Sequence, residues 1–322
     1  MSGSVSTPQV TVVVPTRNRL ALLREAVASV ERQTFADWEL VVVDDASDDG
    51  TREWLEQSAG ARVRTLALAR HSERTVARNR GLDAARGSEV MFLDDDDRLV
   101  PDALALLSGA LARHPQCVAA VGAAVRFDPY GGRERARHPR RRLVRHVWRE
   151  VLAGWDSGSG QALFRSEPLR RAGGWNERLT YWELGDLWIR VATRGPVAFV
   201  PETILELRLH GGQTRPDPSS EDRRECFLEH LSESERADGE RIVRARAHVL
   251  AGDAARLAGH PAAALRHYVR AIATAPLLAR SPLTRSDVLG NMATVAPRAL
   301  VGRRGRAAAR SVRGALWRGR GP

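Results

Sequence analysis

The sequence predicts an α/β fold in which helices flank a mainly parallel sheet and a helical C-terminal region follows. Through residue 97, short apolar runs alternate with segments of helical spacing. This alternation is typical of parallel strands joined by crossover helices. Several of the apolar runs stop abruptly in polar or acidic residues. Beyond residue 220 the chain is rich in Ala and Arg, and its pattern there is helical.

The alternation places the first elements in order. We expect strands over residues 10–14, 40–43, 62–68 and 88–93, and helices after residue 19, from near Thr51 and over residues 74–85. Pro15 stops the first strand, and Gly87 ends the third helix. In such sheets ligands bind beyond the carboxyl ends of the strands. The loops that follow the strands should therefore converge on one crevice.

Four consecutive aspartates, residues 94–97, follow the fourth strand. Like charges this close repel, and protonation or a bound cation relieves the repulsion. Carboxylate oxygens are the ligands that Mg²⁺ and Mn²⁺ prefer, and a solvated acidic turn is the alternative. No G-x-G-x-x-G follows the first strand and no Walker-type lysine loop is present, which argues against a dinucleotide-binding protein or an ATPase.

An ordered set of motifs resembles glycosyltransferase family 2, the large group with the GT-A fold. The motifs are residues 14–19 (VPTRNR), 43–51 (VDDASDDGT), 77–82 (ARNRGL), 92–97 (FLDDDD), 158–165 (GSGQALFR), 173–177 (GGWNE) and 186–190 (DLWIR). Each motif is weak alone, but the ordered set is specific and covers roughly the first two-thirds of the chain. The resemblance implies a GT-A catalytic domain over residues 8–215.

The resemblance implies roles on the donor side. Asp44 or Asp45 would accept a hydrogen bond from the imide N–H of a pyrimidine base, which favours a UDP- or dTDP-sugar. Asp94 and Asp96 would hold Mn²⁺ or Mg²⁺ against the diphosphate and stabilise the charge that develops on it. The residues expected to bind the nucleotide-sugar are Pro15, Thr16, Arg17, Asp44, Asp45, Arg78, Asp94 and Asp95.

Some of these residues have a competing structural interpretation. His210 is expected to supply a further metal contact or to touch the diphosphate, although a lone histidine is more often structural. Arg78 could instead form a surface ion pair with a nearby acid. Asp48 and Asp49 are interpreted as helix-capping residues without a catalytic part.

The sequence departs from the family pattern at the expected catalytic base. The family usually has Glu-Asp-x-Asp-Leu-Trp, in which the first Asp is the general base. Leu184 occupies the position of that Asp. Glu183 and Asp186 share a helix face, so either could reach the acceptor, although Asp186 could instead pair with Arg190. Three alternatives stay open, in this order: Glu183 is the base, the acceptor is acidic and needs none, or the protein binds a nucleotide-sugar without transfer. The expected acceptor region comprises Trp155, Gly158, Ser159, Gly160, Trp182 and Leu184.

Composition limits the remaining choices. The chain has 322 residues and a formal net charge of +11, and its 50 basic residues are all arginines. This bias is typical of GC-rich coding sequence, so it is weak support for an anionic partner. No membrane span or signal peptide is recognised, and Cys117 and Cys226 form no disulfide framework. We expect a cytoplasmic protein, with peripheral attachment to the inner face of the membrane as an alternative.

Two arginine-rich segments, residues 133–149 and 298–322, contain eight arginines each. Such segments are usually solvated faces or tails. Contact with an acidic membrane surface, or with an acidic or lipid-linked acceptor, is the functional alternative. Nucleic acid is not expected as a partner, because no nucleic-acid motif is recognised.

A boundary near residues 214–220 precedes the helical region, residues 216–322. Residues 241–258 and 261–275 predict a helical hairpin around Gly259, which faintly resembles one tetratricopeptide unit. A single unit cannot bury its own apolar face. The hairpin is therefore expected to pack on the catalytic domain or on a second subunit of a homodimer.

These features predict a metal-dependent, inverting glycosyltransferase of the hexosyltransferase type, in carbohydrate or natural-product biosynthesis. A catalytically inactive nucleotide-sugar-binding or scaffold protein is the alternative. The chain keeps Asp94 and Asp96 and lacks only the expected base, which favours the enzyme over the binding protein.

Overall fold

The structure is a computed structural model that describes residues 7–128, 133–135, 143–155, 157–210, 223–280 and 285–300. The chain divides into two compact units. The first comprises Met1–Val147 and Asp156–Glu221, and the second Trp148–Trp155 and Asp222–Pro322. The segment Trp148–Trp155 thus groups with the C-terminal helices. The predicted boundary between residues 215 and 216 lies outside the described residues.

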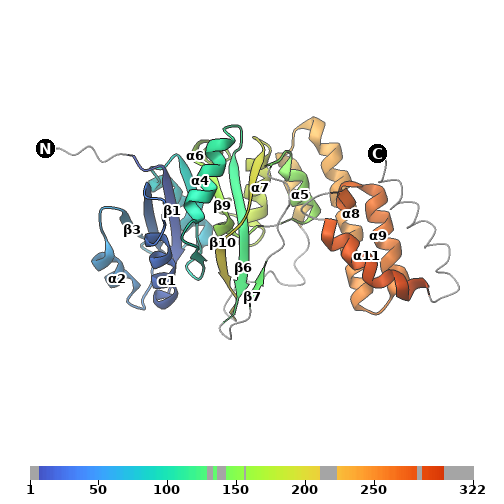
Figure 1. The fold of residues 1–322 in the computed structure, drawn as a ribbon, viewed down its shortest axis with the longest axis horizontal. Helices are drawn as coiled ribbons and strands as arrows, with labels where there is room; N and C mark the ends of the chain where they lie inside the picture. Colours follow the sequence, from blue (N-terminus) through green and yellow to red (C-terminus); the bar gives the residue numbers. More distant parts are fainter. Residues whose placement is uncertain are drawn as a thin grey trace. The chain divides into compact units, whose positions relative to one another are not determined.

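A mixed sheet forms the centre of the first unit (Figure 1). Its strand order is β3-β2-β1-β4-β9-β6-β10-β5, with β7 beside β6 and β8 beside β10. Strands β3, β2, β1 and β4 are parallel, β9 is antiparallel to both of its neighbours, and β6 and β10 are again parallel. The strands are β1 Val10–Thr16, β2 Trp38–Asp44, β3 Val63–Ala67, β4 Glu89–Phe92, β5 Arg98–Leu99, β6 Ala119–Phe127, β7 Arg133–Arg135, β8 Leu143–Val144, β9 Ala162–Arg165 and β10 Val197–Arg208.

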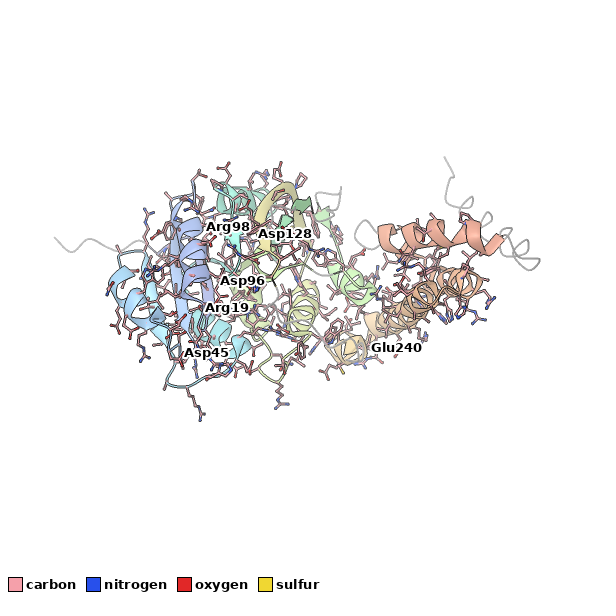
Figure 2. The ribbon with its side chains drawn as sticks, turned by 90° about the horizontal axis from the view of Figure 1, so that it is seen from below. Arg19, Asp45, Asp96, Arg98, Asp128 and Glu240 are labelled. Carbon is pink, nitrogen blue, oxygen red and sulfur yellow. The ribbon has the colours of Figure 1, made fainter. Side chains whose placement is uncertain are left out.

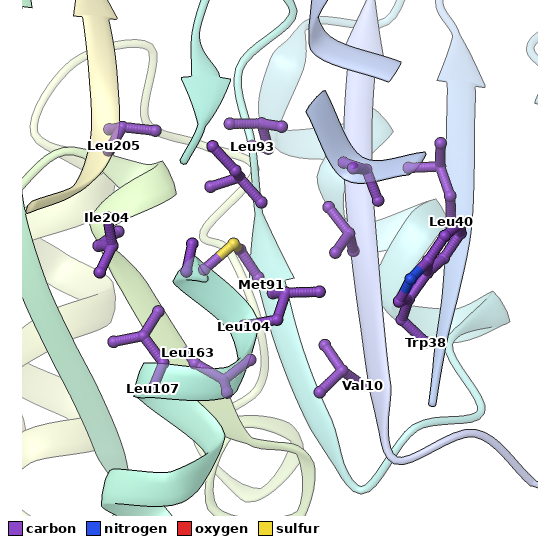
Figure 3. Close-up of a cluster of buried hydrophobic side chains, with 14 of the residues drawn as sticks. Val10, Trp38, Leu40, Met91, Leu93, Leu104, Leu107, Leu163, Ile204 and Leu205 are labelled. Atoms are coloured by element: carbon purple, nitrogen blue, oxygen red, sulfur yellow. The ribbon is translucent and has the colours of Figure 1, made fainter. Parts of the chain in front are cut away.

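Helices cover both faces of this sheet. On one face, α1 and α4 pack on apolar strand residues, and Figure 3 shows the cluster around Met91, Leu104 and Ile204. On the other face, Phe92 contacts the rings of Phe164 and Trp175. The helices of this unit are α1 Leu20–Glu31, α2 Thr51–Ser58, α3 Arg74–Ala84, α4 Ala103–Arg113, the 3₁₀ turn η1 Ser159–Gln161, α6 Ser166–Arg171 and α7 Glu183–Ala192.

The expected α/β fold with a mainly parallel sheet is confirmed. The four predicted strands correspond to β1–β4, with each end within two residues of its expected place. The approach of α3 to β1 depends on Gly81, because a Cβ there would lie 2.2 Å from Cγ1 of Val13. This close packing brings Arg74 and Arg78 of α3 to the carboxyl edge of the sheet, where they line a cavity.

The second unit is helical, as predicted. It contains most of α5 Val147–Ala153, then η2 Arg223–His230, α8 Glu233–Leu257, α9 Pro261–Thr274, α10 Leu277–Arg280 and α11 Arg285–Leu300. The hairpin of α8 and α9 turns at Gly259, whose φ is +76°. Tyr268 packs on Gly252 and donates a hydrogen bond to Asp253, which also accepts one from Asn291. These contacts tie α8, α9 and α11 together.

Two predicted segments fall outside this description. Residues 136–142 of the first arginine-rich segment and residues 301–322 of the second lie outside the described residues. Among the helices that are described, none combines the length and the apolar character needed to cross a membrane.

Candidate active site

A cavity of about 760 Å³ opens at the carboxyl ends of β1, β2 and β4, where the loops were expected to converge. Loop residues after these strands, side chains of α3 and residues near the ends of β6 and β10 line it. Of the ten residues predicted for donor or metal binding, eight line this cavity: Pro15, Thr16, Arg17, Asp45, Arg78, Asp94, Asp95 and Asp96. The two others, Asp44 and His210, are not among the lining residues.

The adjacent carboxylates of Asp44 and Asp45 have different surroundings. Asp45 lines the cavity, where its Oδ2 lies 2.6 Å from Nδ1 of His71 and its Oδ1 accepts a 2.8 Å hydrogen bond from the backbone N–H of Ser72. Asp44 is fully buried, and its Oδ1 accepts the backbone N–H of Ser47. Asp45 is therefore the one of the pair that a nucleotide base could contact.

Asp49 has the capping role that the sequence suggested. Its carboxylate accepts the backbone N–H of Leu20, the first residue of α1, at 3.0 Å and that of Thr51, the first residue of α2, at 3.1 Å. The side chain of Asn18 accepts the backbone N–H of Asp48. These bonds join the loops after β1 and β2 and so fix one wall of the cavity.

Asp94 and Asp95 are held by different partners. Oδ1 of Asp94 accepts a 2.6 Å hydrogen bond from Arg78, and Oδ2 accepts one of 2.8 Å from the Ser159 hydroxyl. Asp95 accepts a hydrogen bond from Thr16 at 2.8 Å and an ion pair from Arg19 at 3.1 Å. The predicted acceptor-region residue Ser159 thus touches the predicted metal ligand directly.

Asp96 and Asp97 complete the acidic loop. Oδ2 of Asp96 lies 2.9 Å from both Arg19 and Nε2 of His210, and Figure 2 shows Arg19 beside Asp96. Asp97 accepts the backbone N–H of Arg208 at 3.0 Å. His210 was predicted as a metal contact, and its ring reaches the expected ligand Asp96.

The pKa values of Asp94, Asp95 and Asp97 are not shifted in the same direction. Burial, and then the charges of Asp94 and Asp96, raise the pKa of Asp97 to about 8. Burial, reinforced by the neighbouring aspartates and opposed by Thr16 and Arg19, raises the pKa of Asp95 to about 6. Burial also acts to raise the pKa of Asp94, but the Arg78 charge and the hydrogen bonds from Arg78 and Ser159 outweigh it and hold that pKa below its usual range.

The acidic loop fits a hard divalent cation. One carboxylate oxygen each from Asp94, Asp96 and Asp97 lies within 4.8 Å of the other two. All three are oxygen donors, which Mg²⁺ and Mn²⁺ prefer. After burial, the charges of Asp94 and Asp96 contribute to the raised pKa of Asp97, and a cation would relieve that repulsion.

Arg78 links this loop to α7. Its side chain is only 6% exposed, so it forms no surface ion pair. The guanidinium contacts Asp94 on one side, lies 3.7 Å from Glu183 on the other, and stacks 4.4 Å from the ring centre of Trp175. Glu183 also pairs with Arg74 at 2.7 Å. Glu183 thus contacts two arginines, Arg74 and Arg78, that line the cavity.

The other predicted residues in and before α7 are not among the cavity-lining residues either. Asp186 pairs with Arg190, which is the structural alternative that the sequence left open, and Arg190 also donates to the carbonyl of Gly174. Trp182 precedes α7 with a left-handed φ of 67°. Leu184 is half-buried and is not among the lining residues.

The predicted acceptor-region residues fall in both compact units. The backbone N–H of Gly158 bonds Gln161, and a Cβ on Gly160 would lie 3.0 Å from Leu205 and 3.2 Å from Leu93, so η1 packs tightly beside β4 and β10. Trp155, in contrast, belongs to the second compact unit.

Several lining residues were given no role from the sequence, among them Arg19, His71, Arg74, Arg126, Leu207 and Leu209. Arg19 could have been found, because it lies in the same motif as Arg17, two residues further on. Arg126 could not, because an arginine near the end of a strand carries no local signal.

The geometry agrees with comparisons to known proteins. Residues 11–172 match the sequence profile described as "Glycosyl transferase family 2". The putative teichuronic acid biosynthesis glycosyltransferase TuaG of Bacillus subtilis is 39% identical over 99 residues, which is 30% of this chain and 39% of that protein. The GalNAc(5)-diNAcBac-PP-undecaprenol beta-1,3-glucosyltransferase of Campylobacter jejuni is 39% identical over 103 residues, 31% of this chain and 33% of that protein. This chain therefore aligns with well under half of each of these two relatives.

The fold is also that of a solved structure. The crystal structure of S. aureus TarS 1-349 in complex with UDP-GlcNAc superposes with a TM-score of 0.64, covering 89% of this chain and 90% of that one. The sequence identity is 17%, so this likeness concerns the fold.

Proposed function

Because this chain belongs to glycosyltransferase family 2 and has the GT-A fold, we propose that it transfers a hexosyl group from a UDP- or dTDP-sugar to an acceptor with the help of Mn²⁺ or Mg²⁺. The cavity beyond β1, β2 and β4 carries the proposal, because the carboxylate of Asp45 and the acidic loop line it together. TarS, whose fold is the same, binds UDP-GlcNAc.

The donor would lie along the carboxyl edge of the sheet. Asp45 would accept the imide N–H of the base, beside Pro15 and Thr16. Arg17, which lines the same end of the cavity, would approach the diphosphate. Oxygens of Asp94, Asp96 and Asp97 would hold the cation, which neutralises charge on the departing diphosphate.

The residues around the leaving group would act by position and charge. Arg78 would keep Asp94 ionised and oriented, since its guanidinium donates to that carboxylate. Ser159 would fix the second oxygen of Asp94. His210 would orient Asp96, or contact the cation itself.

For the acceptor hydroxyl, we propose Glu183 as the base and an inverting outcome. Glu183 is the carboxylate next to Leu184, and Asp186 is already bonded to Arg190. An inactive nucleotide-sugar-binding protein is the second candidate, because Leu184 replaces the usual base and Glu183 is held by Arg74 and Arg78. Peripheral membrane attachment through the arginine-rich tail also remains our proposal.

The donor assignment is tested by titrating UDP into the full chain by calorimetry, with Mn²⁺ or with chelator. We expect Mn²⁺ to tighten binding at least about tenfold through the charge that it neutralises, and Asp96→Ala to remove that difference. Asp48→Ala, an exposed acid outside the cavity lining, should keep it. Equal binding with and without metal would overturn the metal assignment.

A further inference from the structure

We propose that the far end of the cavity, at β6 and β10, binds an anionic group of the acceptor through Arg126. The anion is a phosphate or a carboxylate, and its carrier contacts Leu207 and Leu209, which line the same end. This inference rests on the proposed function, because it assigns the other end of the cavity to the donor.

The strand order separates the two ends. Asp45 follows β2, the acidic loop follows β4, and Arg126 lies on β6, so the order β2-β1-β4-β9-β6 places the acidic loop between them. Neighbouring strands are about 4.8 Å apart, so β6 is roughly 10 Å beyond β4 and about 19 Å from β2. In Figure 2, Asp96 likewise lies between Asp45 and Asp128, which directly follows β6. A donor that spans from Asp45 to the acidic loop leaves the β6 end to the acceptor.

The side chain of Arg126 faces the cavity because of strand alternation. Successive residues of a strand point to opposite faces. Phe127 points away from the cavity and lies under two other arginines, Arg98 at 4.5 Å and Arg208 at 4.9 Å from its ring centre. Arg126 therefore shares the cavity face with its register partner Leu207.

The arginines that line the cavity differ in whether they form ion pairs with carboxylates. Arg19 pairs with Asp95 and Asp96, Arg78 with Asp94 and Glu183, and Arg74 with Glu183. Arg17 and Arg126 are exposed, and among the described residues neither guanidinium has an ion pair or a hydrogen bond.

Arg17 and Arg126 lie at opposite ends of the cavity. Arg17 follows β1 on the donor side, where a diphosphate would neutralise it. Arg126 has no such partner in the donor, and its guanidinium has no ion pair with any side chain that the structure describes; the residue opposite it in β7 is Glu134, whose side chain is outside that description. A cation that lines the cavity together with Leu207 and Leu209 favours an amphiphilic anion over a neutral sugar.

Ligand-observed NMR on the full chain, saturated with Mn²⁺ and UDP, tests the assignment. The probes are glycerol 3-phosphate, glycerate and neutral glycerol, and the saturating UDP keeps free phosphate from the donor site. We expect at least one of the two anions to bind about tenfold or more tightly than glycerol. Arg126→Gln should abolish this preference and leave the affinity for UDP within twofold.

Matched variants locate the effect. Arg17→Gln should weaken UDP binding and keep the anion preference, and Arg52→Gln, an exposed arginine outside the cavity lining, should change neither. Glycerol 3-phosphate and glycerate separately decide between phosphate and carboxylate.

Three results would overturn the inference while leaving the proposed function in place: no anion preference in the parent chain, an unchanged preference in Arg126→Gln, or lost UDP binding in Arg126→Gln. Failure of the parent to bind Mn²⁺ and UDP, with an anion preference that still depends on Arg126, would instead overturn the donor assignment alone.

Discussion

The donor side of the cavity, at β1, β2 and β4, and its acceptor side, at β6, β10 and α7, are built differently. On the donor side the acidic side chains are bonded to partners from other loops, as Asp95 is to Thr16 and Arg19. On the acceptor side Arg126 lines the cavity with Leu207 and Leu209 and has no ion pair with a side chain that the structure describes. Under the proposed function, donor recognition would depend on this prebuilt polar network, whereas the acceptor would supply the negative charge that pairs with Arg126.

The largest expected effect is on turnover and lies at α7. Glu183→Gln should lower the turnover number by about 10²–10⁴-fold if Glu183 is the base, while UDP binding by calorimetry stays within a few-fold. Asp186→Asn should cost less, since Asp186 acts through its pair with Arg190. Equal losses in both variants would contradict a special role for Glu183.

Leu184→Asp sharpens this test by restoring the residue usual in the family. A gain in turnover would identify an ordinary hydroxyl acceptor and a weakened base. A loss would place Leu184 in an apolar acceptor contact. If the parent and all three variants bind UDP and neither transfer nor hydrolyse a UDP-sugar, the second candidate function replaces the first.

The next effect concerns stability on the donor side. Gly81→Ala should lower the free energy of unfolding by about 1–3 kcal/mol, because the new methyl group would overlap Val13. Gly60→Ala is the matched control, since a Cβ there has no neighbour within 4 Å, and it should change stability little. Urea unfolding at constant pH measures both. A neutral Gly81→Ala would mean that α3 can move away from β1 without cost.

A smaller effect links pH to the acidic loop. Since the folded chain raises the pKa of Asp97 to about 8 from an ordinary 3.8, it holds a proton that the unfolded chain has lost, and this contribution to stability declines as the pH rises towards 8. A cation would replace that proton. The rise in Tm on adding Mn²⁺ should therefore grow from pH 6 to pH 8 by scanning fluorimetry. Asp97→Asn should flatten this dependence, and a rise independent of pH in the parent would contradict it.

The smallest effect tests whether acceptor binding involves only the first compact unit. Tyr268→Phe removes the hydrogen bond to Asp253 and should cost about 1 kcal/mol in the second unit. Turnover and KM for any acceptor should not change. A raised KM would mean that helices of the second unit take part in acceptor binding, as the prediction for Trp155 implied.

The two sides also differ in how far the sequence could predict them. β1, β2 and β4 could be placed because each is a short apolar run that ends in a recognisable motif. In the proposed function the loops after them would bind groups common to all nucleotide-sugars, which is why local motifs could point to them. The choice of Asp45 over Asp44 needed the structure, since adjacent residues at a strand end differ only in direction.

The acceptor side gave weaker local signals. β9 lies between β4 and β6, although Ala162–Arg165 follows both in sequence. Such pairing depends on tertiary packing, which periodicity does not encode. Arg126 and Leu207 become cavity residues only through the register of β6 with β10. The pairing of Asp186 with Arg190, in contrast, follows from helical spacing and was anticipated.

Because β9 is synthesised well after its partner β4, the order of synthesis also constrains how the chain folds. Residues 89–91 of β4 pair on one side with β1 and on the other with residues 163–165. While a ribosome is still making the chain, β4 therefore has an open, apolar edge until those residues emerge, and such edges recruit strands from other chains. A fragment ending before β9 should aggregate rather than fold, even though it contains every aspartate of the acidic loop. The hydrogen bond from Ser159 to Asp94 would form only as synthesis passes β9. A site that has this hydrogen bond would therefore belong to a chain in which β9 already pairs with β4.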